Sequence, residues 1–253
     1  MAALGRALLS FVYPPHCILC DKLIGSWAQA EAGICPGCVS AVREQPRERC
    51  LRCSSPLSTQ STPGSLALSA ASSGCPTCAS WPVDRGFGRA ISLGAFDGPL
   101  RDAVHALKFR GNRKIGGILG RCLGASHEMT ELNALIPVPL HAARQRERGY
   151  NQAELIGRGF QQAKETSLIS GALVRARATA QQAQTASAEE RAHNLAGAFV
   201  ARGRELEAIR SGGIAGVVDD VLTTGATVDA CGRAILEVRP DLRVIAIVVA
   251  ITP

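Results

Sequence analysis

The amino-acid sequence predicts an α/β protein, a parallel sheet flanked by helices, with a small Cys-rich module at its N-terminal end. Four C-x-x-C pairs lie within the first third of the 253 residues. Toward the other end, a short apolar run is followed by a segment of helical periodicity, and the last run, 244–251, is continuously apolar. Continuous apolar runs are typical of strands that a parallel sheet buries on both faces.

The chain is long enough for one α/β domain and a smaller module. We expect the Cys-rich module at residues 1–85, with a flexible Ser-, Ala-, Pro- and Gly-rich insertion at 54–74, and the α/β domain at residues 86–253. A hydrophobic content of 46% is typical of a globular protein with a core. No apolar run reaches the roughly 18 residues of a membrane span. The stretch 7–13 is interpreted as a packing helix rather than a secretory signal, which favours the cytoplasm.

The formal net charge is +7, and arginine far outnumbers lysine. Guanidinium groups bind phosphate bidentately, so the excess suits a polyphosphate ligand or nucleic acid. Solubility and the codon usage of a GC-rich genome explain the same excess. Charge alone therefore does not separate these interpretations.

The C-x-x-C pairs predict zinc, because a two-residue gap lets both thiolates bind one tetrahedral ion and two pairs complete a Cys₄ site. Pairing in order predicts two sites, although interleaved pairing stays open. A disulfide framework or a redox motif is the alternative, and paired spacing in a loop-rich, reducing context disfavours both. Four thiolates leave no open position, so zinc is predicted to be structural. The candidate ligands are Cys17, Cys20, Cys35 and Cys38 for the first site, and Cys50, Cys53, Cys75 and Cys78 for the second.

The two remaining cysteines, Cys122 and Cys231, lie in apolar helical stretches and are interpreted as core. Between the pairs and the C-terminal third, apolar spacing predicts a strand at 90–96, helices at 100–109 and 115–129, and a buried strand at 134–139 that stops at proline. Lys108 and Arg110 end the first helix, where they would also complement the helix dipole.

Residues 140–152 predict a loop dense in guanidinium groups, followed by a helix at 151–164. A cationic loop after a strand suits a pyrophosphate group, and a solvated basic turn is the alternative. A strand is expected at 168–176. The polar run that follows, through residue 194, predicts a mobile segment that could close over a substrate, with His193 as a surface or packing residue.

The stretch 213–227 predicts a strand, a turn and a helix start. Small and β-branched residues end in Asp219 and Asp220, then a Thr/Gly turn precedes a helix at 228–238. A helix N-terminus binds phosphate through free amides, and Gly225 lets the backbone approach it closely. Two carboxylates at the end of a strand suit ribose hydroxyls or hydrated Mg²⁺. The predicted ligand is a sugar phosphate, because the TTGAT tail fits a Walker-B-like strand end poorly.

The run VVDDVLTTGAT resembles the phosphoribosyl pyrophosphate (PRPP) signature of type I phosphoribosyltransferases. Taken with PVPL, RERGYNQAEL, R-x-R-x-T and R-x-x-N-L-x-G-A-F in this order, and with the N-terminal cysteine pairs, it resembles the ComF family, which joins a zinc finger to a phosphoribosyltransferase domain. The chain departs from the usual pattern at Ala180 and Gln181, where prolines are common, so residue roles near there are left open.

The resemblance implies a type I phosphoribosyltransferase fold with a small hood, structural zinc, and PRPP bound with Mg²⁺. Asp219 and Asp220 would be the catalytic pair that holds the ribose, and Thr179–Asn194 would be the flexible loop. The implied PRPP-binding residues are Val218, Asp219, Asp220, Thr223, Thr224, Gly225, Ala226, Thr227, Arg144, Arg148 and Lys108. The family also implies a link to DNA uptake in natural transformation, with single-stranded DNA or a helicase-like component of the uptake machinery as partner.

Three functions stay open at this point. The first is a PRPP-dependent transferase whose acceptor supplies the attack, so that no nucleophile or general base is expected in the chain. The second is a competence factor that binds single-stranded DNA, and the third is a PRPP-regulated scaffold. An aromatic content of 4% offers few stacking platforms for single strands, which favours the first function or a mixture of the first and second. The acceptor and the oligomeric state are not predicted.

Overall fold

The computed structural model describes residues 16–24, 33–43, 49–56, 75–79, 81–82, 84–126, 132–176, 195 and 197–252. Three expectations fall outside these residues: the packing helix at 7–13, most of the insertion at 54–74, and the mobile segment with His193. Among the described residues, no helix combines the length and apolarity needed to cross a bilayer.

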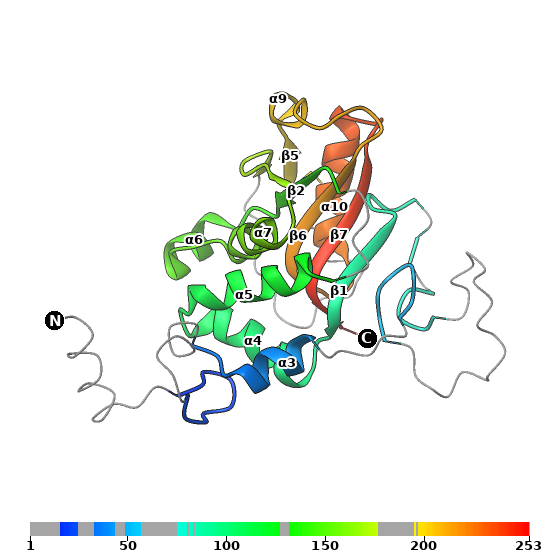
Figure 1. Ribbon diagram of the computed structural model, residues 1–253. Coiled ribbons are helices and arrows are strands. Elements are labelled where there is room, and N and C mark those ends of the chain that lie inside the picture. Colours follow the sequence, from blue (N-terminus) through cyan, green and yellow to red (C-terminus); the bar gives the residue numbers. More distant parts are fainter. Residues whose placement is uncertain are drawn as a thin grey trace.

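Five parallel strands form the central sheet, in the order β1-β7-β6-β2-β3 (Figure 1). β6 lies inside the sheet, between β7 and β2, and its residues 215–218 are buried. The predicted parallel α/β sheet is therefore confirmed. The strands are β1 Arg89–Ala95, β2 Ala134–Pro137, β3 Ser167–Leu168, β6 Ile214–Leu222 and β7 Arg243–Ile251.

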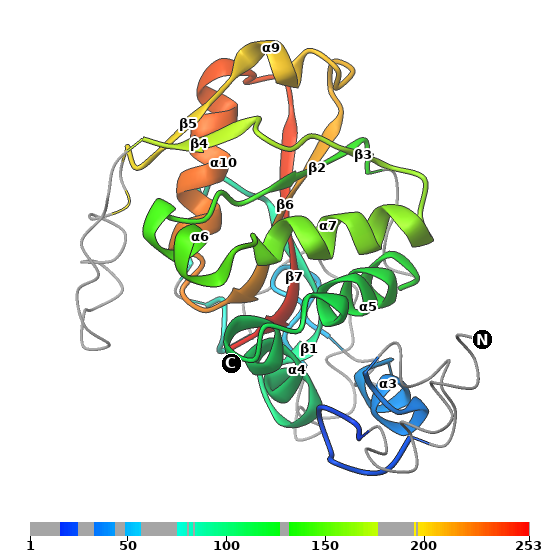
Figure 2. The same cartoon turned by 90° about the vertical axis from the view of Figure 1, so that its left-hand side faces the viewer.

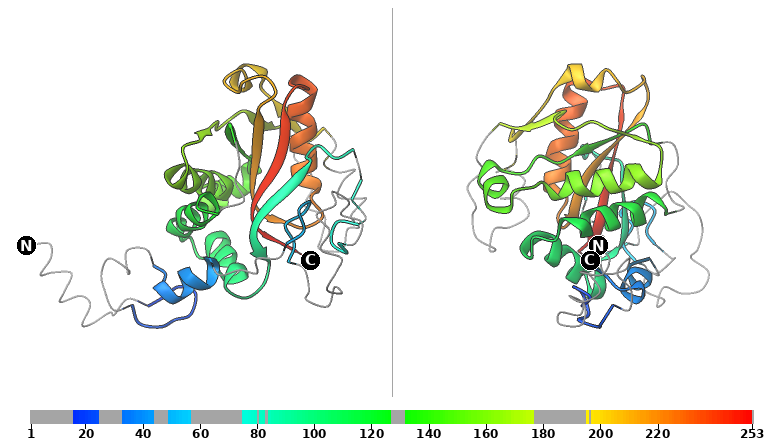
Figure 3. Two further views of the ribbon diagram at one scale, coloured as in Figure 1. Left: turned by 45° about the vertical axis from the view of Figure 1, so that its right-hand side comes forward. Right: turned by 60° about the vertical axis from the view of Figure 1, so that its left-hand side comes forward.

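Helices cover both faces of this sheet (Figure 3). Three helices pack on one face: α4 (Gly98–Phe109), α5 (Arg113–Gly124) and α7 (Gln152–Ala163). Between them and the sheet lies the first core, to which Val218 contributes. α10 (Ala226–Val238) packs on the other face, where Val217 belongs to a second core. Because successive side chains of a strand point to opposite faces, β6 contributes to both cores.

The shorter elements are α3 (Pro36–Arg43), α6 (Ala142–Arg148), α9 (Gly203–Leu206) and a small antiparallel sheet of β4 (Leu173–Arg175) and β5 (Phe199–Ala201). Leu173 and Phe199 share the second core with Ile235 of α10. The small sheet thus lies beside α10, as Figure 2 shows.

The prediction of a loop at 140–152 is wrong, because most of this segment is α6. The His141 imidazole accepts a hydrogen bond from the Ala143 N–H at 3.2 Å and caps the helix start. Gly149 ends the helix in the left-handed region, at φ 72°. The residues between them are strong helix formers, and none of them is buried, so no apolar periodicity marks the helix in the sequence.

The single strand expected at 168–176 is also wrong. The chain pairs with β2 only at 167–168, turns through Gly171 at φ 85°, and then joins the small sheet as β4. A left-handed glycine breaks a strand that periodicity alone would continue.

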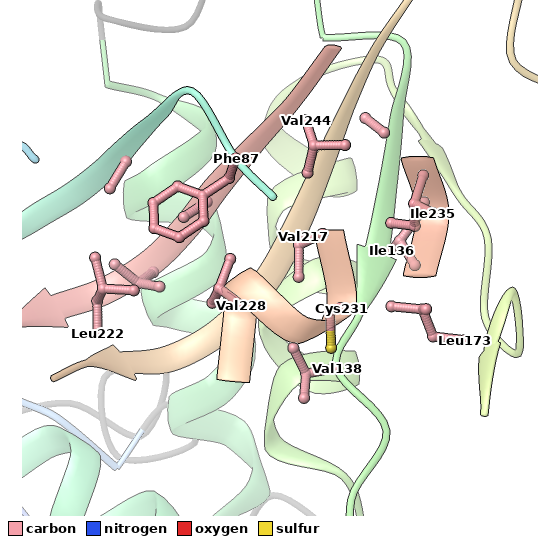
Figure 4. Packing of buried hydrophobic residues seen from close by; sticks show 14 of the residues in the cluster. Phe87, Ile136, Val138, Leu173, Val217, Leu222, Val228, Cys231, Ile235 and Val244 are labelled. Carbon is pink, nitrogen blue, oxygen red and sulfur yellow. The ribbon is translucent and has the colours of Figure 1, made fainter. Parts of the chain in front are cut away.

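The two Cys-rich segments pack against opposite faces of the sheet. Cys17 and Val42 share the first core with Leu107 of α4. Cys50 and Cys78 share the second core with Val228 of α10, part of which is seen in Figure 4. The Ala90 N–H of edge strand β1 also donates to the Arg52 carbonyl. Because both segments share cores with the sheet, the division at residue 85 stays a prediction.

Candidate functional site: two cysteine tetrads and the β6–α10 turn

Eight cysteines gather into two tetrads. Within each tetrad all Sγ atoms lie within 4.8 Å of one another. Cys20 and Cys35 are 3.7 Å apart, Cys50 and Cys78 are 3.6 Å apart, and so are Cys53 and Cys75. The structure brings the C-x-x-C pairs together in order and not interleaved. The first tetrad is Cys17, Cys20, Cys35 and Cys38, and the second is Cys50, Cys53, Cys75 and Cys78.

The tetrads fit zinc. Four sulfurs at about 2.3 Å from a tetrahedral ion are about 3.8 Å apart, close to the observed separations. No disulfide joins the described cysteines. The second tetrad is fully buried, whereas Cys20 of the first is exposed. As predicted, Cys122 and Cys231 lie apart from both tetrads, buried in the two cores.

The β6–α10 connection has the predicted strand, turn and helix. β6 runs two residues past the carboxylates, to Leu222, so Asp219 and Asp220 lie within the strand. α10 begins at Ala226, and its N-cap is Gly225 at φ 79° without a side-chain cap. The Thr224 hydroxyl is 3.4 Å from the Ala226 N–H. Apart from this Ala226 amide, a glycine N-cap leaves the first-turn amides available to an anion.

Asp220 of β6 forms an ion pair with Lys108 of α4, the helix that packs on one face of the sheet. Its carboxylate lies 2.8 Å from Lys108 Nζ, and both side chains are largely buried, with exposed fractions of 11% and 24%. Lys108 was one of two cations at the end of the predicted helix, and complementing the helix dipole was the alternative role for it. The structure instead directs its ammonium group to the strand that precedes the turn.

Asp219 has a different environment. Burial first, and then the neighbouring Asp220 carboxylate, raise the pKa of Asp219 to about 7, while Lys108 opposes the shift. The Asp219 carboxylate also contributes to raising the pKa of the buried Cys231 thiol of α10, after burial itself. Consecutive strand residues face opposite ways, so one carboxylate faces α4 and the other lies toward α10. The two are chemically distinct groups, not one chelating pair.

The RERGYN segment holds the end of α4 in place. The Tyr150 hydroxyl donates to the Leu107 carbonyl, which precedes Lys108. The Arg148 guanidinium lies 5.4 Å from the centre of the Phe109 ring. Asn151 caps α7 and donates to the Val138 carbonyl at 2.9 Å. The RERGYN segment and the end of α4 are 43 residues apart in the sequence, measured from Tyr150 to Leu107. They meet beside Lys108, the residue that pairs with Asp220.

The remaining predicted ligand-binding residues are spread around this edge. Val218 is fully buried in the sheet, so only its backbone could meet a ligand. Thr223 is exposed, whereas Thr224 and Thr227 are partly buried. Arg144 is exposed on the first turn of α6. Burial lowers the pKa of Arg175 in β4, Cys231 opposes that shift, and Arg144 adds to it.

Sequence reasoning missed Arg85, which lies beneath the turn. Its Nη2 donates to the Thr224 carbonyl at 2.9 Å, and its guanidinium lies 4.3 Å from the Trp81 ring centre. The only signal in the sequence is an arginine in the run Asp84-Arg85-Gly86-Phe87-Gly88. A polar run between modules is usually a linker, so the signal was weak.

These features define a class of protein: a double zinc ribbon joined to a parallel α/β domain whose central strand carries paired carboxylates before an uncapped helix. Comparison with known proteins supports the first part, because a double zinc ribbon domain model matches residues 8–79. The DNA utilization protein YhgH of Salmonella typhi is 31% identical over 230 residues, 88% of this chain and 91% of that protein.

Two further relatives are similar to this chain over nearly the same share of its length. YhgH of Escherichia coli K12 is 30% identical over 232 residues, 88% of this chain and 91% of that protein. Competence protein F of Haemophilus influenzae is 28% identical over 222 residues, 85% of this chain and 87% of that protein. The chain belongs to the ComF family.

Proposed function

We propose that this protein binds PRPP at the β6–α10 turn and transfers its phosphoribosyl group, in a cytoplasmic pathway of DNA utilization. The observation that carries the proposal is the N-terminus of α10, which has a glycine N-cap and directly follows the strand that carries Asp219 and Asp220. The first-turn amides would bind the 5′-phosphate, with the hydroxyls of Thr223, Thr224 and Thr227 as added donors.

In the transfer step, the bond from the anomeric carbon to pyrophosphate breaks, and its electron pair leaves with the pyrophosphate oxygen. A lone pair of the acceptor forms the new bond, and a proton carried by the attacking atom passes to pyrophosphate or to solvent. No oxidant or reductant is needed. Lys108 and the α6 arginines, Arg144 and Arg148, would stabilise the charge that develops on pyrophosphate. Asp219 and Asp220 would hold the ribose hydroxyls.

Mg²⁺ would enter with the pyrophosphate and share in neutralising it. Within the described residues, the groups that could hold a metal by themselves are the two cysteine tetrads, so the paired carboxylates alone make a weak Mg²⁺ site. We also propose that the eight tetrad cysteines each bind one of two structural zinc ions.

The test is calorimetric titration of the zinc-loaded protein with PRPP and Mg²⁺. Asp219→Asn combined with Asp220→Asn is expected to abolish binding without changing zinc content. Asp102→Asn, at an exposed position of α4, is the matched control and should bind as wild type does. Retained affinity in the double variant would rule out this site.

A second candidate function, binding of single-stranded DNA, is favoured by one exposed aromatic residue. Phe109 is 69% exposed, and its ring lies 5.6 Å from His105 and 5.4 Å from the Arg148 guanidinium. Arg110, Arg113 and Arg146 are exposed nearby on α4, α5 and α6 or at their ends. A base can stack on such a ring while cations contact the phosphates. The relatives' names, DNA utilization protein and competence protein, support this role.

Fluorescence anisotropy with a labelled oligothymidylate tests the second function. Phe109→Ser should weaken binding several-fold, and binding should fall as salt rises, because phosphate contacts release counterions. Val200→Ser, which alters another exposed apolar residue in β5, should have no effect. Equal losses in both variants would argue against a specific surface at Phe109.

A further inference from the structure

A short strap joins the second cysteine tetrad to the α/β domain. Its described residues are 81–82 and 84–88, and the Trp81 N–H donates to the Cys78 carbonyl. Arg52, between Cys50 and Cys53, donates from its guanidinium to the carbonyls of Cys78, Trp81 and Pro82, at 3.3, 3.3 and 2.9 Å. The geometry of the strap therefore depends on the folded tetrad.

The strap packs against the first two turns of α10. The Gly86 N–H donates to Asp229 Oδ1 at 2.7 Å, and the Arg233 guanidinium donates to the Asp84 carbonyl at 2.8 Å. A Cβ atom at Gly232 would lie 1.9 Å from the Gly86 carbonyl oxygen, so the two backbones touch. Phe87 packs in the same core as Val228, as Figure 4 shows.

Arg85 lies between this strap and the turn. Its guanidinium stacks 4.3 Å from the Trp81 ring centre and 5.4 Å from that of Phe87, while Nη2 donates to the Thr224 carbonyl. A Cβ atom at Gly225 would lie 2.3 Å from Nη1. Gly225 is thus required twice, for its positive φ and for the space that Arg85 fills.

The guanidinium has unused hydrogen-bonding capacity. Nε and Nη1 of Arg85 are buried and have no hydrogen-bond partner among the described residues. A partly buried cation beneath the turn adds positive charge where α10 already presents the positive end of its dipole. Among the described residues, Arg85 contacts the backbone of the turn at the Thr224 carbonyl, so it acts through that carbonyl.

We propose that Arg85 is a positioning residue through which the second zinc ribbon controls the shape of the phosphate-binding turn. Loss of zinc from the second tetrad would release Trp81, then Arg85, and then the Thr224 carbonyl, and the first-turn amides of α10 would no longer converge. The inference rests on the proposed function for its effect on PRPP, but its effect on the turn itself does not depend on any ligand.

The first experiment compares Arg85→Met with Arg233→Met. Arg85 belongs to the strap and contacts the turn at Thr224, whereas Arg233 belongs to α10 and contacts the strap at Asp84. Hydrogen–deuterium exchange of peptides covering residues 221–230, in the ligand-free full-length protein, should be several-fold faster in Arg85→Met and nearly unchanged in Arg233→Met. Zinc content should stay at the wild-type value in both. Wild-type exchange rates in Arg85→Met would overturn the proposal.

The second experiment measures PRPP affinity in the same proteins. Arg85→Met should weaken binding about tenfold or more, as expected for the loss of a hydrogen bond from a charged group, and Arg85→Lys should recover little, because an ammonium group does not stack and donate in the same plane. If wild type does not bind PRPP, the proposed function fails, while the exchange measurement still decides the role of Arg85.

The link to zinc is tested by a double-mutant cycle. Cys75→Ser should speed exchange at the turn in an otherwise wild-type chain, but should add little in the Arg85→Met background, because the coupling passes through Arg85. Where Cys75→Ser does not fold, Trp81→Leu tests the step from Trp81 to Arg85, since it removes the stacking partner and leaves the tetrad cysteines unchanged. Additive effects in both cycles would show that the ribbon acts on the turn by another route.

Discussion

Asp219 makes stability depend on pH in an unusual direction for a carboxylate. Its pKa is raised to about 7, so between about pH 4 and pH 7 the folded state holds a proton that the unfolded state has lost. Stability from this group is present at low pH and is lost as pH rises through about 7. Ligands that hydrogen-bond an ionised carboxylate would reverse this effect near neutral pH.

We therefore predict that Asp219→Asn flattens the pH dependence. At pH 8 the variant should be more stable than wild type by about 4 kcal/mol or less, since one pKa unit corresponds to about 1.4 kcal/mol. At pH 5 the difference should be much smaller. Thermal unfolding across this range is the measurement, and parallel curves for the two proteins would contradict the prediction.

The Lys108–Asp220 pair predicts non-additive behaviour. Lys108→Met removes the partner of a largely buried carboxylate and should cost about 1–3 kcal/mol of unfolding free energy. The double variant Lys108→Met/Asp220→Asn should recover part of that loss, because no charge is then left unpaired. Denaturant unfolding of the single and double variants gives the coupling, and simple additivity would show that the pair contributes nothing.

At the scale of elements, α5 and α7 are in unusually close contact. A Cβ atom at Gly120 of α5 would lie 2.0 Å from the Ile156 carbonyl oxygen of α7, and one at Gly159 would lie 2.2 Å from the Gly117 carbonyl oxygen. Glycines at these positions let the two helices approach along their backbones. This contact places α7, and with it the Asn151 cap, against the sheet.

We predict opposite effects for two glycines of the same helix. Gly120→Ala should destabilise the protein by about 1–3 kcal/mol, because the helices must separate. At Gly117 the nearest atom to an added Cβ is the flexible end of Arg121, at 3.5 Å, so Gly117→Ala should stabilise by about 0.5–1 kcal/mol through helix propensity. Chemical denaturation of both variants checks this, and a loss at Gly117 would argue against the helix contact described.

Another element-scale result is α6. Its three arginines lie on a helix and none of them is buried, and Gly149 and Tyr150 then redirect the chain so that Tyr150 reaches Leu107. The basic charge expected after β2 is present, but a helix carries it and not a loop. A helix holds Arg144 and Arg148 at fixed spacing, one turn apart, which a solvated loop would not do.

At the scale of the whole molecule, the two ribbons lie on different cores and should differ in their contribution to stability. Cys53 is fully buried in the core that also holds α10, whereas Cys20 is exposed. We predict two zinc ions per chain in wild type and one in each of Cys53→Ser and Cys20→Ser. Cys53→Ser should lower the melting temperature more, because it opens a core shared with the sheet.

Metal analysis by atomic absorption and thermal unfolding of the same samples test this prediction. Chelation of wild type should lower its melting temperature below that of either single variant, since both ribbons then lose their metal. A single zinc ion in the wild-type protein would contradict the assignment of two tetrads. Equal melting temperatures for the two cysteine variants would show that burial does not set their order.

The sequence by itself determined what depends on local spacing. The four C-x-x-C pairs, the β6–turn–α10 unit around Asp219 and Asp220, and the continuously apolar β7 are each contained within a short segment, so periodicity and turn chemistry are sufficient to predict them. The same local reasoning failed at α6 and at β3–β4, where an exposed helix and a glycine break leave no periodic pattern.

Only the tertiary structure decided which segments meet. It brought the cysteine pairs together in order, directed Lys108 to Asp220, and seated Arg85 under Thr224, which is 139 residues away along the chain. Contacts of this kind depend on how strands order themselves in the sheet and how helices pack over it. That arrangement follows from the packing of the entire chain, so the residues at either end of such a contact carry no local sign of their partner.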